Sequence, residues 1–391
     1  MSERFISPLV RDVPPSGIRR FFDIAGTMKD AISLGVGEPD FVTPYHIRNA
    51  AIDSLLAGET QYTANRGLLP LRREIAGYIS GRMHVEYDPE KEILVTVGAS
   101  EGIDLSLRTC IRPGDEVLVP DPGYVSYAPC VTLAGGVPVS VKTDVRDGFR
   151  LSAEMLEKCI TPKTRALIFP YPNNPTGVVM ARADLTAIAP LIIKHDLLVI
   201  SDEIYCELTY DGEQHTSIAS LPGMRERTVM LNGFSKAFAM TGWRLGYACG
   251  PAPLIEQMNK IHQYTIMCAP RQSQVAAIEA LRKGRENQYQ DIENMRKSYD
   301  RRRRLMVNAF NEMGLSCTAP GGAFYCFPSI RETGMTSEEF CTRLLREKKV
   351  VCVPGTAFGE AGEGFIRCCY ATAVDQLTEA FKRISEFLQT I

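Results

Sequence analysis

Residues 232–247 read Asn232-Gly233-Phe234-Ser235-Lys236-Ala237-Phe238-Ala239-Met240-Thr241-Gly242-Trp243-Arg244-Leu245-Gly246-Tyr247. In this stretch a lysine lies among small and aromatic residues. Such surroundings are not typical of a lysine that only carries a surface charge. A partly desolvated amine at Lys236 can form an imine with an aldehyde, and Arg244 would then offer a fixed cation to a phosphate. Most lysines and arginines instead pair with carboxylates at the surface, and taken alone the stretch favours that use. The interpretation therefore depends on the rest of the chain.

Short β-rich runs alternate with helical patterns between about residues 90 and 250. The runs cover residues 92–98, 115–120, 164–170, 197–201 and 228–232. This alternation predicts an α/β protein with a mostly parallel sheet covered by helices on both faces. Ligands of such sheets bind at the carboxyl ends of the strands. Polar motifs follow four of the runs, at 98–102, 173–177, 202–205 and 235–236, so we expect them to meet at one edge of the sheet.

The motifs NNPTG (173–177), SDEIY (201–205) and SKAFAMTGWRLGY (235–247), together with Arg367, resemble the fold-type I aminotransferases of classes I and II. The resemblance extends from about Ser33 to Tyr370, nearly the whole chain. It implies a large domain with a mostly parallel, mixed seven-stranded sheet and a smaller α+β domain. We expect an N-terminal arm with part of the small domain in 1–45, the large cofactor-binding domain in 46–285 and the small domain in 286–391.

The cofactor implied by the resemblance is pyridoxal 5'-phosphate, with Lys236 as the Schiff-base lysine. Asp202 matches the aspartate that keeps the pyridine nitrogen protonated, although an aspartate after a strand can also be a helix N-cap. Tyr205 and Asn174 match the two donors to the ring oxygen. Lys236, Asp202 and Tyr205 are thereby the expected catalytic residues.

The phosphate of the cofactor is expected at residues that open a helix. Gly98, Ala99 and Ser100 would present backbone N–H groups and a hydroxyl at the positive end of the helix dipole, although helix capping explains these residues equally well. Arg244 and Ser235 complete the cofactor-binding set. Many relatives carry a serine three residues before the lysine, where this chain has Gly233, which departs from the family by offering no hydroxyl at that point.

Four further positions match the family. Tyr124 resembles the aromatic residue that stacks on the cofactor ring, and Tyr62 resembles the tyrosine that reaches the phosphate of the neighbouring subunit, which implies a homodimer with shared active sites. Arg367 matches the arginine that grips the substrate α-carboxylate. The loop containing Val36 and Gly37 matches the segment that closes over the same group, so these residues and Asn174 form the expected substrate site.

The implied activity is transfer of an amino group from an L-amino acid to a 2-oxo acid by a ping-pong aldimine mechanism, in amino-acid metabolism. The substrate is left open among aromatic amino acids, aspartate and N-acetyl-diaminopimelate; Ser100 replaces a lysine of one aspartate-specific group. Arg271 could meet an acidic substrate or form an interface ion pair. A C–S β-lyase on the same scaffold is the alternative. A non-catalytic regulatory domain is disfavoured because a fused DNA-binding segment would have no room before residue 35.

The composition excludes several other classes. A net charge of −2 over 391 residues gives no basic footprint for nucleic acid. The N-terminus has charges where a signal peptide needs an apolar run, and no stretch is apolar enough to cross a membrane, so we expect a cytoplasmic protein. Twelve cysteines without a CxxC motif indicate reduced thiols, and five histidines without a ligand pair indicate no metal site.

Overall fold

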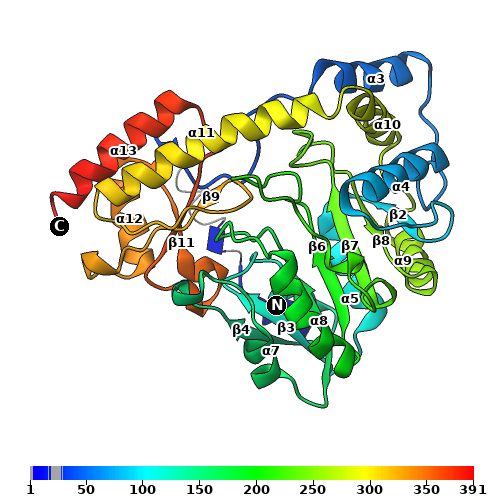
Figure 1. Ribbon diagram of the computed structural model, residues 1–391, viewed down its shortest axis with the longest axis horizontal. Coiled ribbons are helices and arrows are strands. Elements are labelled where there is room, and N and C mark those ends of the chain that lie inside the picture. Colours follow the sequence, from blue (N-terminus) through cyan, green and yellow to red (C-terminus); the bar gives the residue numbers. More distant parts are fainter. Residues whose placement is uncertain (1–2, 16, 19–27, 29) are drawn as a thin grey trace.

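The computed structural model describes residues 3–15, 17–18, 28 and 30–391, and its centre is a seven-stranded sheet in the order β2-β8-β7-β6-β5-β3-β4 (Figure 1). Strand β8 is antiparallel to both neighbours, and every other neighbouring pair in this sheet is parallel. The α/β fold class with a mixed, mostly parallel sheet is confirmed. In spatial order the strands span Ile93–Thr96, Gly246–Cys249, Thr228–Gly233, Leu198–Asp202, Thr164–Phe169, Glu116–Asp121 and Val137–Lys142.

The predicted β-rich runs form five of these strands, and their side chains alternate between two helical layers. In β6, Val199 packs into one apolar cluster and Ile200 into the cluster on the opposite face. One face is covered by α5 (Gly98–Cys110), α6 (Tyr127–Leu133) and α9 (Ala252–Thr265). The other is covered by α4 (Leu69–Met83), α7 (Ala153–Cys159), α8 (Arg182–Lys194) and α10 (Arg271–Glu286).

A smaller unit follows in the chain and has its own apolar core. The three-stranded antiparallel sheet in this unit is β11 (Val353–Pro354), β12 (Ile366–Cys369) and β9 (Tyr325–Cys326). Its helices are α11 (Gln290–Glu312), α12 (Ser337–Lys348) and α13 (Val374–Leu388), at the left of Figure 1. The N-terminal segment joins it, because β1 (Ile32–Ser33) pairs with β10 (Val350–Val351). The exact boundaries at residues 45 and 285 stay predictions.

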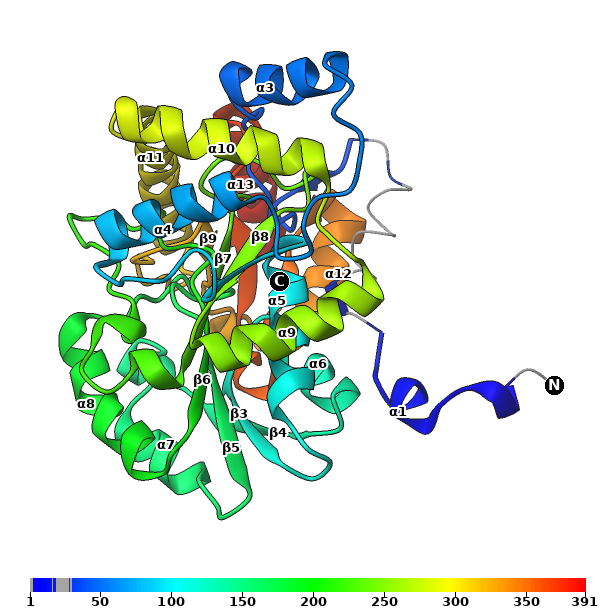
Figure 2. The same ribbon diagram turned by 90° about the vertical axis from the view of Figure 1, so that its right-hand side faces the viewer.

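Two N-terminal helices lie at the outside of the molecule. The short helix α1 (Pro8–Arg11) stands away from the sheet, and α3 (Tyr45–Leu56) packs on α10 at the edge farthest from β4 (Figure 2).

The charged stretch 282–304 is divided between two helices, α10 and α11. The backbone breaks between α10 and α11, where Gln288 and Tyr289 each have a φ of 56°. The Tyr289 ring turns back toward Gly284, where a Cβ would lie 2.5 Å from the ring, so only glycine allows this contact. The stretch is not wholly exposed, because Arg303 is buried and pairs with Asp300.

No cluster of three or more His, Cys, Asp or Glu side chains within the described ranges is arranged to hold a metal ion. The same residues form no helix with the length and hydropathy needed to cross a bilayer. All twelve cysteines are free thiols.

Candidate active site

A cavity of about 1090 Å³ opens at the carboxyl ends of β2, β6 and β7. These ends share one edge because β2 and β7 are both antiparallel to β8, and β6 is parallel to β7. The cavity brings together most of the residues expected from the sequence: Gly37, Gly98, Ala99, Ser100, Tyr124, Asn174, Asp202, Tyr205, Ser235, Lys236, Arg244 and Arg367.

The amine of Lys236 lies in the cavity between two backbone segments. Its Nζ donates a hydrogen bond of 2.6 Å to the carbonyl of Gly37 and lies 5.6 and 5.9 Å from the ring centres of Phe324 and Tyr205. Desolvation is the main reason that the pKa of Lys236 is lowered to about 8, and the nearby Arg367 cation adds to it. A substantial fraction of this amine is therefore neutral near pH 8.

Asp202 is the last residue of β6, and its carboxylate is buried. It accepts hydrogen bonds from the Tyr127 hydroxyl at 2.8 Å and from the backbone N–H of Ile204 at 3.3 Å. Burial raises the pKa of this carboxyl above its usual value. Since no described cation forms an ion pair with it, the site favours a positively charged ligand group beside Asp202.

Glu203 explains why the end of β6 is rigid. Its fully buried carboxylate accepts hydrogen bonds from Ser201 at 2.8 Å, from Ser217 at 2.7 Å and shares one of 2.7 Å with His215. Three partners compensate the burial of this charge. The network fixes the turn that carries Asp202 and Tyr205.

Arg367 projects from β12 and is 2% exposed. Its guanidinium lies 4.4 Å from the ring centre of Tyr325 and 4.8 Å from that of Phe358. The Nη atoms donate to the side-chain oxygen of Asn174 at 2.9 Å and to the carbonyl of Gly35 at 2.5 Å. The buried Nε atom has no hydrogen-bond partner among the residues that the structure describes. A cation without a carboxylate, stacked on aromatic rings, is suited to bind an anionic group.

Tyr205 and Tyr325 share a hydrogen bond of 2.8 Å between their hydroxyl groups. Each hydroxyl can donate once and accept twice, so this contact leaves capacity for a ligand. The Tyr325 ring also contacts the N-terminal loop, because a Cβ on Gly37 would lie 2.3 Å from the Tyr325 hydroxyl oxygen. Glycine at position 37 is therefore required by the close approach of backbone and side chain.

The first turn of α5 faces the cavity without a side-chain cap. Gly98 opens the helix with a φ of +77°, and Val97 at the N-cap position supplies no capping hydrogen bond. The guanidinium of Arg244 lies against this turn: a Cβ on Gly98 would be 2.8 Å from an Arg244 Nη atom. A helix N-terminus and a cation that converge in this way can hold a phosphate.

Position 233 has no space for a serine. A Cβ on Gly233 would lie 2.9 Å from the carbonyl of Leu245 and 3.0 Å from the Cα of Gly246. Ser235 lines the cavity instead. Glycine, which has no hydroxyl group, is therefore the residue that the packing allows at position 233.

The exposure and contacts of four residues singled out in the sequence bear on the roles predicted for them. Tyr124 is half-buried and packs edge-on against Tyr127, with ring centres 5.5 Å apart. Val36 is 40% exposed and Tyr62 is 78% exposed, and neither belongs to the cavity wall of its own chain. Arg271 forms an ion pair of 3.2 Å with Glu59 and likewise lies outside that wall.

Several residues of the site were not identified from the sequence. Tyr127, Tyr325 and Phe358 contact Asp202, Tyr205 and Arg367 from elements far away in the chain, and such contacts leave no local motif. The N-terminal segment also contributes Val13, Pro14, Pro15, Gly17 and Ile18 to the cavity wall.

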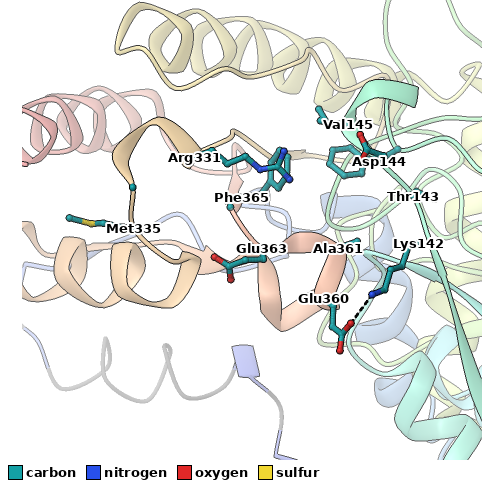
Figure 3. A pocket seen from close by; sticks show the side chains of 13 residues that line it. Lys142, Thr143, Asp144, Val145, Arg331, Met335, Glu360, Ala361, Glu363 and Phe365 are labelled. Carbon is teal, nitrogen blue, oxygen red and sulfur yellow. Dashed lines mark hydrogen bonds and ion pairs between the residues drawn. The ribbon is translucent and has the colours of Figure 1, made fainter.

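A second cavity, of about 580 Å³, lies between β4 and the loops that precede α12 and β12 (Figure 3). An exposed ion pair of 2.8 Å between Lys142 and Glu360 spans one side of it, and Arg331 lies over the Phe365 ring. None of the predicted site residues lines it. The chemistry predicted from the sequence therefore belongs to the larger cavity.

Comparison with known proteins agrees with this geometry. Residues 29–384 match the family described as aminotransferase class I and II. The chain is 54% identical to the putative aminotransferase YugH of Bacillus subtilis, and the match covers 98% of each chain. It is 51% identical to an aspartate aminotransferase of Pyrococcus abyssi, and that match covers 96% of each chain. The crystal structure of an aromatic aminotransferase from Pyrococcus horikoshii superposes with a TM-score of 0.90 at 48% identity, over 95% of this chain and 99% of that one.

Proposed function

Because this chain belongs to the class I and II aminotransferases, we propose that its larger cavity binds pyridoxal phosphate and moves an amino group from an L-amino acid to a 2-oxo acid in two successive half-reactions. The observation that carries the proposal is the meeting of Lys236, whose pKa is lowered to about 8, with the buried and cation-free carboxylate of Asp202 in one cavity. An aldehyde cofactor with a basic ring nitrogen requires this pair.

The residues present fit the cofactor. The amine of Lys236 would bind its aldehyde carbon, and Asp202 would accept a hydrogen bond from its protonated ring nitrogen. The side-chain oxygen of Asn174 accepts a hydrogen bond from Arg367, so the side-chain NH₂ group of Asn174 stays available as a donor. This group and the hydroxyl of Tyr205 would both donate to the ring oxygen of the cofactor. Tyr124 would cover the ring. The phosphate would lie at Gly98, Ala99, Ser100, Ser235 and Arg244, with Tyr62 of a second subunit.

When bound, pyridoxal phosphate supplies an electron sink for the bond that breaks at the substrate Cα. Arg367 would bind the substrate α-carboxylate through its Nε and an Nη, while the nearby rings of Tyr325 and Phe358 hold the guanidinium in position. The neutral Lys236 amine takes the proton from the substrate Cα as general base, and the resulting ammonium group would deliver it to the C4′ carbon of the cofactor as general acid. Gly37, whose carbonyl accepts a hydrogen bond of 2.6 Å from Nζ, would lie on the carboxylate side of the bound substrate, and the adjacent Val36 stays outside the cavity wall.

A panel of L-amino acids tests the activity, with the half-reaction followed by the absorbance of the bound cofactor and the products identified. We expect a 2-oxo acid and retention of the amino group on the protein, which 2-oxoglutarate or pyruvate then removes. Ammonia, pyruvate and a thiol as products would show β-elimination and contradict the proposal.

The variant Lys236→Ala should reduce transfer by about 10³-fold, within the range of general acid–base catalysis, because the protein then lacks its proton carrier. The exposed Lys158→Ala serves as a matched control and should keep wild-type rates. Near wild-type turnover by Lys236→Ala would refute the assignment.

A further inference from the structure

The charged groups on the described wall of the cavity are three cations and two anions. Lys236, Arg244 and Arg367 are each required by the proposed function, for the aldehyde, the phosphate and the α-carboxylate. Of the anions, Asp202 serves the ring nitrogen, and Glu38 accepts a hydrogen bond of 3.1 Å from Thr241. The part of the wall that the described residues of a single chain form thus retains no cation for a second carboxylate on the substrate.

The wall beside Arg367 is apolar. Phe358, which stacks on the guanidinium, belongs to a buried cluster against which Ile18, Val125 and Ala357 pack. These three side chains are half-buried and line the cavity. They come from three segments far apart in the sequence and form one apolar surface next to the carboxylate-binding group.

The N-terminal segment is in close contact with this surface. A Cβ on Gly17 would lie 3.3 Å from the Cβ of Ala357, which is tighter than ordinary van der Waals contact. Val13, Pro14 and Pro15 extend the apolar lining beyond Ile18. A carboxylate placed against such a wall would lose its hydration without gaining an ion pair, whereas an aromatic ring would bury apolar area.

We propose that the amino donors of this protein carry uncharged, large apolar side chains, above all aromatic ones, and that Ile18, Val125 and Ala357 form the subsite for that side chain. The inference rests on the proposed function, because it takes Arg367 as the anchor of the α-carboxylate. The proposal assigns the choice of amino donor to the apolar side chains of the cavity wall beside Arg367.

The experiment measures the apparent second-order rate constant of the half-reaction of the wild-type holoenzyme with L-phenylalanine, L-tyrosine, L-leucine and L-aspartate. We expect phenylalanine and tyrosine to react at least tenfold faster than aspartate, since binding an apolar group in an apolar pocket discriminates by one to two orders of magnitude. Reaction with aspartate at an equal or higher rate would overturn the substrate class while leaving the aminotransferase function intact. Conversion by none of the donors in a broad amino-acid panel would overturn the proposed function instead.

The subsite is tested separately by Ile18→Arg, which puts a cation on the apolar wall. The rate constant for phenylalanine should fall about tenfold and that for aspartate should rise severalfold. The same substitution on an exposed helical position outside the cavity, Ile193→Arg, should change neither. If Ile18→Arg leaves the ratio of the two rate constants within twofold of wild type while the cofactor spectrum is intact, the assignment of the wall is wrong.

Discussion

Among the single residues of the site, Arg367 has a guanidinium that protein groups hold in place while one of its donors stays available for a ligand. Two aromatic rings and two hydrogen bonds fix the guanidinium, and its Nε–H is buried without a hydrogen-bond partner among the described residues. A buried donor without an acceptor costs free energy, so the ligand that supplies the acceptor gains affinity.

Replacement of Arg367 by lysine should raise the KM for the amino donor and lower kcat/KM about 10- to 100-fold, because a lysine offers no planar, bidentate contact. Steady-state kinetics with one donor and one acceptor measure the effect. Arg331→Lys is a matched control, because Arg331 also lies over an aromatic ring, 4.8 Å from the centre of Phe365, but outside the site. An unchanged KM in Arg367→Lys would contradict the role of Arg367.

The lowered pKa of Lys236 gives a pH prediction. The neutral amine is the nucleophile, and with a pKa of about 8 its population rises between pH 7 and 9 and then levels off. The rate at which the cofactor-free protein takes up pyridoxal phosphate, followed by absorbance, should show the same dependence. A rate that still rises steeply at pH 10, as for an unperturbed lysine with a pKa near 10.4, would refute the desolvated setting.

At the scale of elements, the phosphate end of the site depends on how closely α5 approaches β8. Gly246, the first residue of β8, lies so near the helix that a Cβ would be 2.5 Å from the Ala99 nitrogen and 2.6 Å from the Gly98 carbonyl carbon. Gly246 also faces Gly233 across the β7–β8 pair. Glycine at position 246 thus lets the N-terminus of α5 lie close to the sheet.

Substitution Gly246→Ala should push α5 away from β8, lower the free energy of unfolding by about 1–3 kcal/mol and weaken pyridoxal phosphate binding at least tenfold. Urea unfolding and cofactor titration measure the two effects. Gly242→Ala is the control, because a Cβ there has no neighbour within 4 Å. Equal cofactor affinity in the two variants would show that the close approach is unimportant.

The sequence predicts elements and site residues where the signal is local. Five strands follow from uniformly apolar runs, and Lys236 and Asp202 follow from short motifs at strand ends. The strands β4 and β8 were not identified as runs, since β4 is an edge strand that contains Pro138 and β8 is a four-residue strand that begins with glycine. Contacts such as that of Tyr127 with Asp202 depend on the tertiary fold and have no local signature.

At the scale of the whole molecule, α3 presents apolar side chains to solvent. Ile52, Leu55 and Leu56 are 51%, 53% and 81% exposed on this peripheral helix, and Tyr62 follows it. Exposed apolar side chains gathered on one helix mark an interaction surface. We expect this surface to meet a second copy of the chain, as the homodimer implied by the family resemblance requires.

The double substitution Leu55→Asp/Leu56→Asp should convert the protein to monomers and reduce activity, because Tyr62 would no longer reach a neighbouring site. Sedimentation equilibrium and the half-reaction rate measure both effects. Leu133→Asp, at a position 46% exposed on α6, is the control and should stay dimeric. A wild-type protein that sediments as a monomer at micromolar concentration would contradict the expectation.

The unpaired Nε of Arg367, the cation-free Asp202 and the uncapped start of α5 have a thermodynamic consequence for the molecule as a whole. Bound ligands would give each of these groups a partner that the described protein residues do not supply. Folding and ligand occupancy are therefore linked, and a free cofactor concentration of 100 times Kd adds about 2.7 kcal/mol to the stability. In a cell, the lifetime of this protein against proteolysis would follow the supply of its cofactor.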